Sequence, residues 1–250
     1  MTTGKVFIGC ILAVVIGLVI RFSLQFIPAF TIKEVRIAEE TGRGVPASVI
    51  GVVKPLYGKN SYGFVLAELQ KDILKDPVVK QVKVKRSLPA GLEVSLAVKE
   101  ARAVLLAIKE DGSNDAYIVT TGWDFLPLGK ADSDVYGQDV VRIEITPTYA
   151  SMLKRYGVDG KFRSVLSMVG SLSDETSLIT MVKYDNNSSN SLGKVVLVLA
   201  PLNAQISIRE EVDALHLSQA IAVVKAEQAG QVPTKDPTRY DVYDSGLVRR

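Results

Sequence analysis

The chain has 250 residues and a formal net charge of +3 at neutral pH, from 30 basic and 27 acidic side chains. Charges so nearly balanced argue against a nucleic-acid-binding protein. The only cysteine, Cys10, excludes a disulfide within the chain and any metal site made of several cysteines. We therefore expect domains that are held together by core burial alone, which a chain of this length can supply.

The N-terminal segment is predicted to be an uncleaved membrane anchor. Residues 6–20 are an unbroken apolar and small-residue run, which residues 22–27 extend beyond Arg21. The extended run can span a bilayer if the Arg21 side chain snorkels to the interface. A cleaved signal peptide is the alternative, but Arg21, Phe22 and Leu24 occupy the place where a cleavage site needs small residues. We predict a tail over residues 1–5 and a transmembrane helix over residues 6–27, with an orientation that charge alone does not fix.

A small α+β domain is predicted after the anchor. Residues 31–37 alternate between apolar and polar, as a half-buried strand does, and residues 82–85 and 92–99 repeat this pattern around a turn at residues 88–91. Helical spacing of apolar residues is found at 47–53 and 64–74. The order strand, helix, helix, strand, strand predicts a sheet with two helices on one face.

A second, β-rich domain is predicted from residue 102 onwards. Strands are expected at 117–128 (with a turn inside), 140–145, 178–184 and 194–199, and helices at 149–156 and 163–169. Residues 185–193 have the composition of a hairpin loop. A long amphipathic helix over 209–228 and a strand over 239–248 are expected to follow. The apolar side of that helix would consist of Leu215, Leu217, Ile221, Val223 and Val224, and Trp123 and Phe125 are expected in the core.

Several short motifs of the first domain resemble the POTRA domain of the FtsQ/DivIB cell-division family. They are Phe30 to Ile37, Gly58-Lys59-Asn60, Val78 to Arg86, Leu88-Pro89 and Leu92 to Glu100. Near the C-terminus Asp241-Val242 is similar to a family motif, although Tyr243 stands where arginine is usual. The resemblance implies a transmembrane helix, a POTRA domain (β-α-α-β-β) over residues 30–101, and an FtsQ-type β domain over residues 102–250 with a long helix and a C-terminal strand.

The same resemblance implies a function. Proteins of this family are non-enzymatic scaffolds that recruit and hold septal cell-wall synthesis proteins at midcell. The resemblance places the chain in the cell inner membrane, with its N-terminus in the cytoplasm and its later domains in the periplasm. It implies FtsB- and FtsL-like coiled-coil proteins as partners, and no cofactor, metal, nucleic acid or small-molecule substrate.

A strand that follows a long helix at the C-terminus is a natural sheet edge, and an open edge can accept a strand from a partner. The alternative is that its side chains only pack into the domain's own core. The predicted partner-binding residues are Tyr240, Val242, Tyr243, Ser245, Gly246 and Leu247.

A second candidate site is the basic run Lys80, Lys83, Lys85 and Arg86. Charged residues along a strand often form a solvated face that protects an edge from aggregation. The alternative is a docking patch for an acidic partner or for anionic headgroups.

Two further functions are left open. A membrane-anchored Ser/Lys hydrolase would use Ser61 with Lys59 or Ser87 with Lys85, but both pairs are expected in turns, and the single histidine, His216, is expected in a helix. A POTRA-bearing envelope assembly or secretion factor is the other alternative. Such proteins usually carry repeated POTRA modules, whereas this chain has one.

Overall fold

The computed structural model describes residues 2–129, 132, 135–136, 140–172, 176–186, 192–230 and 235–250, without the side chains of residues 2–11 and 21. The described chain divides into two compact units, residues 1–98 and 99–250. The boundary predicted at residues 101/102 lies three residues further on, inside a strand of the second unit.

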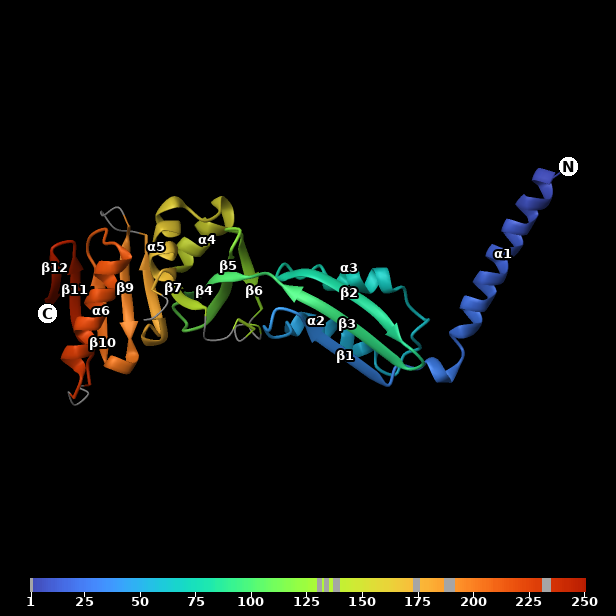
Figure 1. Cartoon of the computed structure of the whole chain (residues 1–250), viewed down its shortest axis with the longest axis horizontal. Helices are drawn as coiled ribbons and strands as arrows, with labels where there is room; N and C mark the ends of the chain where they lie inside the picture. The colour runs from blue at the N-terminus through green and yellow to red at the C-terminus, as the bar shows by residue number, and fades with distance from the viewer. Residues whose placement is uncertain are drawn as a thin grey trace. The chain divides into compact units, whose positions relative to one another are not determined.

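The first unit contains an N-terminal helix and a small α+β domain (Figure 1). Its elements are α1 (Thr2–Leu24), η1 (Pro28–Phe30), β1 (Glu34–Glu39), α2 (Ala47–Val53), η2 (Lys54–Leu56), α3 (Leu66–Ile73), β2 (Val79–Ser87) and β3 (Gly91–Val98). Within the part of the chain that the structure describes, no helix is long and apolar enough to cross a membrane. The transmembrane helix over residues 6–27 therefore stays a prediction.

The sheet of the first unit has the strand order β1-β3-β2, with β3 parallel to β1 and antiparallel to β2. Leu92, Val94 and Leu96 on β3 are at most 1% exposed, because every second side chain of the central strand faces the helices. The helices bury Val49 and Leu69. The predicted order of strand, helix, helix, strand, strand is confirmed.

The second unit is built on one mixed sheet with the strand order β12-β11-β10-β9-β8-β7-β4-β5-β6. Parallel pairs are β4 with β7, β7 with β8, and β10 with β11. Its strands are β4 (Ala101–Ile108), β5 (Asn114–Thr120), β6 (Phe125–Leu128), β7 (Val141–Ile145), β8 (Met181–Asp185), β9 (Lys194–Leu199), β10 (Ala204–Ile208), β11 (Thr238–Tyr243) and β12 (Gly246–Arg249). Its helices are α4 (Pro147–Tyr156), α5 (Gly160–Gly170), η4 (Thr176–Leu178), η5 (Ala200–Leu202) and α6 (Ala214–Gln228).

Two strands of the second unit were not predicted from the sequence, and of these only β4 lacks the alternating pattern on which the prediction relied. In β4 the side chains of Ala103, Val104 and Leu105 are all 0% exposed, so this strand is buried on both faces and its sequence does not alternate. The strand β10 was also not predicted. Of the predicted hairpin loop at 185–193, residues 187–191 lie outside the described residues, and β8 and β9 on either side pair antiparallel.

The long helix begins at Ala214, five residues later than predicted. Asp213 caps its first turn by accepting a hydrogen bond from the backbone N–H of His216. Before this cap the chain is hydrogen-bonded to β11, because the Arg209 N–H donates to the carbonyl of Val242. The predicted apolar side was partly wrong, since Leu215 and Val223 are 64% and 47% exposed.

An aromatic cluster joins α4, α5 and β8 in the core of the second unit. The rings of Tyr149, Phe162 and Tyr184 lie between 4.8 and 5.6 Å from one another. Asp159 caps α5 by accepting from the Phe162 N–H, and it also accepts from the Tyr149 hydroxyl at 2.5 Å. Burial raises the pKa of Tyr149, and the hydrogen bond to Asp159 raises it further. One carboxylate therefore fixes both the start of α5 and the position of a buried tyrosine.

Trp123 and Phe125 pack against this core while staying partly exposed. The guanidinium of Arg102 lies 4.4 Å from the centroid of the Trp123 ring, and that of Arg163 lies 5.3 Å from it. Two arginines on one indole are typical of a cation–π contact that covers the edge of a core.

The change Asp159→Ala removes the cap of α5 and the partner of the Tyr149 hydroxyl. We expect the free energy of unfolding to fall by about 2 kcal/mol, as measured by chemical denaturation. The control is Glu110→Ala in an exposed turn, for which we expect a change within about 0.5 kcal/mol. Equal effects of the two changes would contradict this role of Asp159.

Candidate interaction surfaces

The segment over residues 239–248 is a hairpin and not the single strand that was predicted. The strands β11 and β12 are joined by a turn at Asp244 and Ser245, and β12 is the terminal strand of the sheet order (Figure 1). The interior strand β11 lies between β10 and β12. The open edge is therefore β12, over Gly246–Arg249.

This arrangement separates the six predicted partner-binding residues. Tyr240 and Val242 are 1% and 2% exposed and lie in the core. Tyr243 is half-buried, and Ser245 and Gly246 are exposed at the turn. Leu247 packs against the core from the edge strand. Among these six residues the buried ones therefore lie on β11 and the exposed ones at the turn and on β12.

A nearly buried carboxylate holds the hairpin. The Asp241 side chain is 3% exposed and accepts a hydrogen bond from Arg209 Nε at 2.9 Å. Its other oxygen forms an ion pair with Arg250 Nε. Arg209 precedes α6 and Arg250 follows β12, so Asp241 joins three parts of the chain. The sequence analysis named the Asp241-Val242 motif but did not predict these ion pairs. Arg209 is distant from Asp241 in sequence, and Arg250 lies at the chain end.

The Tyr240 hydroxyl joins the hairpin to α6. It donates to Glu227 Oε2 at 2.9 Å and accepts from Gln228 Nε2 at 2.8 Å. Burial raises the pKa of Tyr240, and the neighbouring Glu227 carboxylate raises it further. The face of β11 towards α6 is thereby occupied by the unit's own residues.

The pairing of β12 shows which of its backbone groups face outwards. The Arg250 N–H donates to the carbonyl of Arg239. Because hydrogen-bonded and non-hydrogen-bonded pairs alternate in an antiparallel ladder, Gly246 and Val248 direct their amides towards β11. Leu247 and Arg249 direct their N–H and C=O groups towards the open edge. This edge can accept one more strand.

The other sheet edges carry features that discourage strand addition. The strand β6, at the opposite edge of the large sheet, contains Pro127. In the first unit, β1 presents Glu34 and Arg36, which form an ion pair. The other edge strand of that unit, β2, carries lysines. The edge strand β12 contains no proline and one charged residue, Arg249.

The basic run on β2 does not form one face. Lys83 and Lys85 are exposed on the side of the sheet away from the helices, as predicted, and Lys80 lies at a break in the pairing register. Arg86 points to the other side, so its assignment to the same patch was wrong. Its Nε donates to the carbonyl of Ser61 at 2.8 Å, and its guanidinium lies 4.9 Å from the centroid of the Tyr62 ring. Arg86 therefore fixes the loop of Ser61 and Tyr62. Of the four basic residues, Lys83 and Lys85 share the face of the sheet away from the helices.

Of the residues in the hydrolase alternative, the pair of Ser61 and Lys59 and the histidine His216 are not arranged for catalysis. Ser61 is 1% exposed and its Oγ has no hydrogen-bond partner in the described structure, so Lys59 does not contact it. His216 is exposed in the first turn of α6, where its Nδ1 lies 3.0 Å from Asp213 Oδ1. A histidine next to a helix cap, without a serine or cysteine partner, gives no nucleophilic site. Among the described side chains, no cluster of three or more His, Cys, Asp or Glu residues could hold a metal ion.

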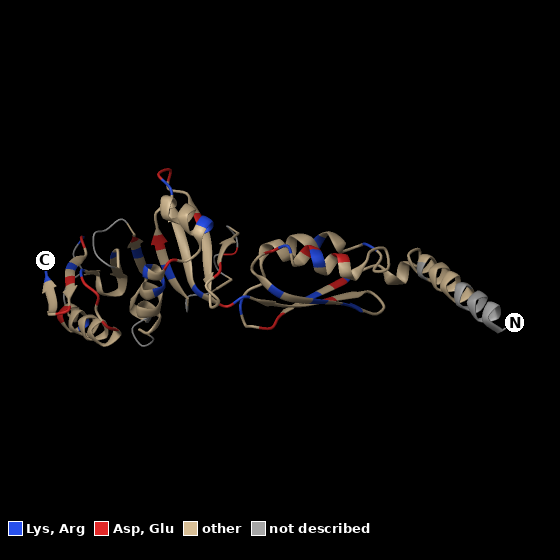
Figure 2. Cartoon of the chain, turned by 90° about the horizontal axis from the view of Figure 1, so that it is seen from above, with Lys and Arg blue, Asp and Glu red and all other residues tan. Residues whose placement is uncertain are grey.

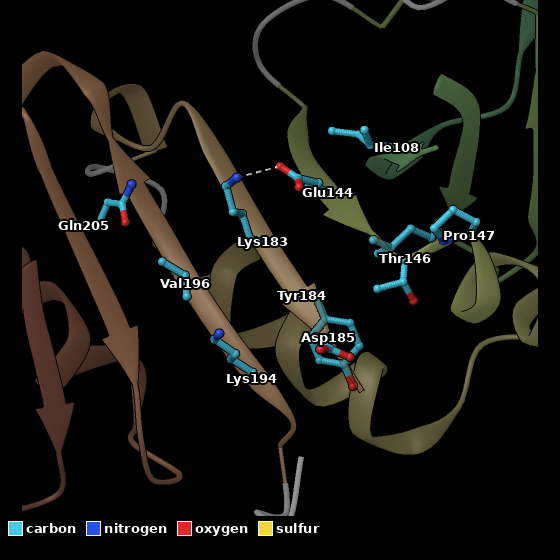
Figure 3. A pocket seen from close by; sticks show the side chains of 11 residues that line it. Ile108, Glu144, Thr146, Pro147, Lys183, Tyr184, Asp185, Lys194, Val196 and Gln205 are labelled. Carbon is cyan, nitrogen blue, oxygen red and sulfur yellow. Dashed lines mark ion pairs between the residues drawn. The ribbon is translucent and has the colours of Figure 1, made fainter. Parts of the chain in front are cut away.

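A shallow depression of about 440 Å³ lies over β7, β8 and β9 (Figure 3). Glu144 and Lys183 form an ion pair of 3.0 Å across it, with side chains that are 28% and 50% exposed. Asp185, Lys194 and Gln205 add further polar groups around it. Opposite charges that neutralise each other on an open surface are typical of a solvated sheet face and not of a ligand pocket.

Comparison with known proteins identifies the first unit. Residues 30–100 match the family model described as POTRA domain, FtsQ-type. This confirms the POTRA domain that the sequence motifs predicted and supports a protein similar to the FtsQ/DivIB family. A search of curated proteins finds no match.

The change Asp241→Asn leaves Arg209 and Arg250 without their shared counter-charge. We expect the free energy of unfolding to fall by about 2 kcal/mol. We also expect faster hydrogen exchange at the amides of Gly246, Val248 and Arg250, which face β11, because β12 loses one of its attachments. Asp244→Asn, the same change at an exposed position of the turn, is the control. If both variants exchanged at the rate of the unchanged protein, Asp241 would not hold the edge strand.

Proposed function

We propose that this protein is a membrane-anchored, non-enzymatic scaffold of the cell-division machinery. It recruits septal cell-wall synthesis proteins and holds them at midcell. The observation that carries this proposal is the match of residues 30–100 to the FtsQ-type POTRA domain. The FtsQ type favours division over the envelope assembly and secretion proteins that carry other POTRA modules.

The proposed topology follows the domain order. Residues 1–5 form a cytoplasmic tail and residues 6–27 span the inner membrane. The POTRA domain over 30–101 and the β domain over 102–250 lie in the periplasm. The unbroken apolar run at residues 6–20 and the position of the POTRA match directly after the helix support this order.

The proposed partner site is the open edge of β12 together with the turn at Ser245 and Gly246. FtsB- and FtsL-like coiled-coil proteins are the proposed partners, and one of them adds a strand to β12. The outward N–H and C=O groups of Leu247 and Arg249 provide the hydrogen bonds. The exposed side chain of Val248, at 52%, and the half-buried Tyr243 provide contacts that select the partner. Tyr240 and Val242 support the strand from the core.

The pairing register gives a sharp test of strand addition. Arg249→Pro removes an N–H that faces the open edge and leaves the ladder between β11 and β12 with its own hydrogen bonds. We expect this variant to bind co-expressed FtsB- and FtsL-like proteins at least about tenfold more weakly than the unchanged protein. The readout is the affinity of the purified full chain for those proteins.

The matched control is Arg249→Ala, which removes the same side chain but keeps the N–H. We expect it to bind like the unchanged protein, and thermal unfolding of both variants verifies that the second unit is folded. Equal binding by the proline and alanine variants would show that no partner strand pairs with β12.

A further inference from the structure

Three segments of the first unit meet at the end where the chain leaves α1. They are residues 25–33, residues 54–66 and residues 84–91. The Ile32 N–H donates to the carbonyl of Lys59, and the Lys33 N–H donates to the carbonyl of Ala90, at 2.9 and 2.8 Å. The Ser61 N–H donates to the carbonyl of Phe30 at 2.9 Å. We call the surface that these segments form the basic end of the first unit (Figure 1).

The basic end contains no acidic residue in any of its three segments. Lys33, Lys54, Lys59 and Lys85 are all exposed on it. Carboxylates adjoin it on the strands: Glu34, which is paired with Arg36, follows Lys33, and Glu93 is the cross-strand partner of Lys85. The opposite end of the same sheet carries both signs of charge (Figure 2), because its loops contain Glu40 and Asp76 together with Arg43 and Lys75. The charge of the domain is therefore distributed unevenly between its two ends.

Large apolar side chains are exposed among these lysines. Tyr57 and Leu88 are each 64% exposed, and Val65 is 38% exposed. At the end of α1, Phe26 and Ile27 are 71% and 39% exposed. Exposed leucine and tyrosine next to lysines match the composition of surfaces that lie in the interface of a bilayer, where apolar groups insert and ammonium groups meet phosphates.

The basic end is held to the residues that follow α1. Asn60 Nδ2 donates to the carbonyls of Leu24 and Ile27 at 3.2 and 3.0 Å. The carbonyl of Leu24 also accepts from the Ile27 N–H and that of Ile27 from the Phe30 N–H, so Asn60 gives each carbonyl a second donor. Arg86 holds the same loop from the other side through the carbonyls of Ser61 and Phe64. The surface is therefore fixed next to the point where the chain would leave the membrane.

We propose that the basic end of the first unit lies on the membrane surface and binds anionic lipid headgroups. Lys33, Lys59 and Lys85 contact the phosphates, and Leu88 and Tyr57 insert at the level of the headgroups. The attraction of lysines to an anionic surface acts only within about 8 Å at physiological salt, and the hydrogen bonds of Asn60 keep the lysines close to the anchor. This inference rests on the membrane anchor of the proposed function.

The test uses the full chain in lipid nanodiscs, with Cys10→Ser so that single labelling sites can be introduced. An environment-sensitive fluorophore is attached at Leu88→Cys on the basic end or at Leu74→Cys, a 46% exposed leucine that follows α3 at the other end. Lipids with a quencher in the headgroup region report whether the label reaches the bilayer. In nanodiscs with phosphatidylglycerol we expect strong quenching at position 88 and none at position 74.

The charge requirement is tested with Lys33→Gln, Lys59→Gln and Lys85→Gln combined. Each lost lysine should weaken adsorption about fivefold, so the triple variant should shift the equilibrium about a hundredfold and lose the quenching at position 88. The matched control combines Lys71→Gln, Lys75→Gln and Lys80→Gln, which removes the same charge away from the basic end and should keep the quenching.

Two results would overturn the inference: a label at position 88 that stays in water, or quenching that survives loss of the three lysines of the basic end. If the label at position 88 stayed in water, and became shielded from solvent only when an acidic division protein was added, the basic end would bind a protein and not lipid. A chain that failed to incorporate into nanodiscs at all would refute the anchor itself, and the inference with it. A chain that incorporates without quenching refutes the inference alone and leaves the anchor intact.

Discussion

The open edge of the large sheet depends on the carboxylate of Asp241. A charged group that is 3% exposed is stable only when its hydrogen bonds and its charge are satisfied, and here two arginines do this. Arg209 lies before α6 and Arg250 lies after β12, so the same carboxylate keeps the start of the helix and the edge strand in register. An edge strand with only four residues has few ladder hydrogen bonds of its own. Its order therefore comes from this ion-pair group and from Leu247, which packs on the core.

The proposed function assigns different kinds of contact to the two units. In the first unit, the carbonyls after α1 are tied to the loop of Asn60, and lysines and exposed apolar side chains surround that connection. In the second unit, backbone groups of β12 are available for a partner strand. Among the described side chains, neither surface includes a group of three or more His, Cys, Asp or Glu residues that could hold a metal ion. Both surfaces are suited to hold other molecules in place, as a scaffold requires.

The sequence analysis predicted most elements in which one face is exposed and the other is buried, although it missed β10, whose side chains alternate in burial. The strand over 92–98 was predicted because Leu92, Val94 and Leu96 alternate with residues on the open face. The strand β4 was missed because Ala103, Val104 and Leu105 are buried on both sides, so no alternation appears. Hydrophobic periodicity reveals a strand only when its two faces differ in exposure, and a central strand of a large mixed sheet is buried on both faces.

The candidate sites were predicted less well, for a different reason. Residues 239–248 were predicted as one strand although Asp244, Ser245 and Gly246 are typical turn residues, and this missed turn moves the edge to β12. Arg86 was grouped with Lys83 and Lys85 by sequence, although strand geometry puts it on the opposite face, where it holds the loop of Ser61 and Tyr62. The partners of Arg86 and Asp241 are distant in sequence, so only the folded chain brings them together.

The most direct test of the account is live-cell imaging of a fluorescent protein fused to the N-terminus, which the proposed topology places in the cytoplasm. If the protein is a division scaffold, the fusion forms a band at midcell in dividing cells and is dispersed in cells that are not dividing. A uniform signal around the envelope throughout the cell cycle would contradict the division function, and it would leave a POTRA-bearing envelope protein with a different partner.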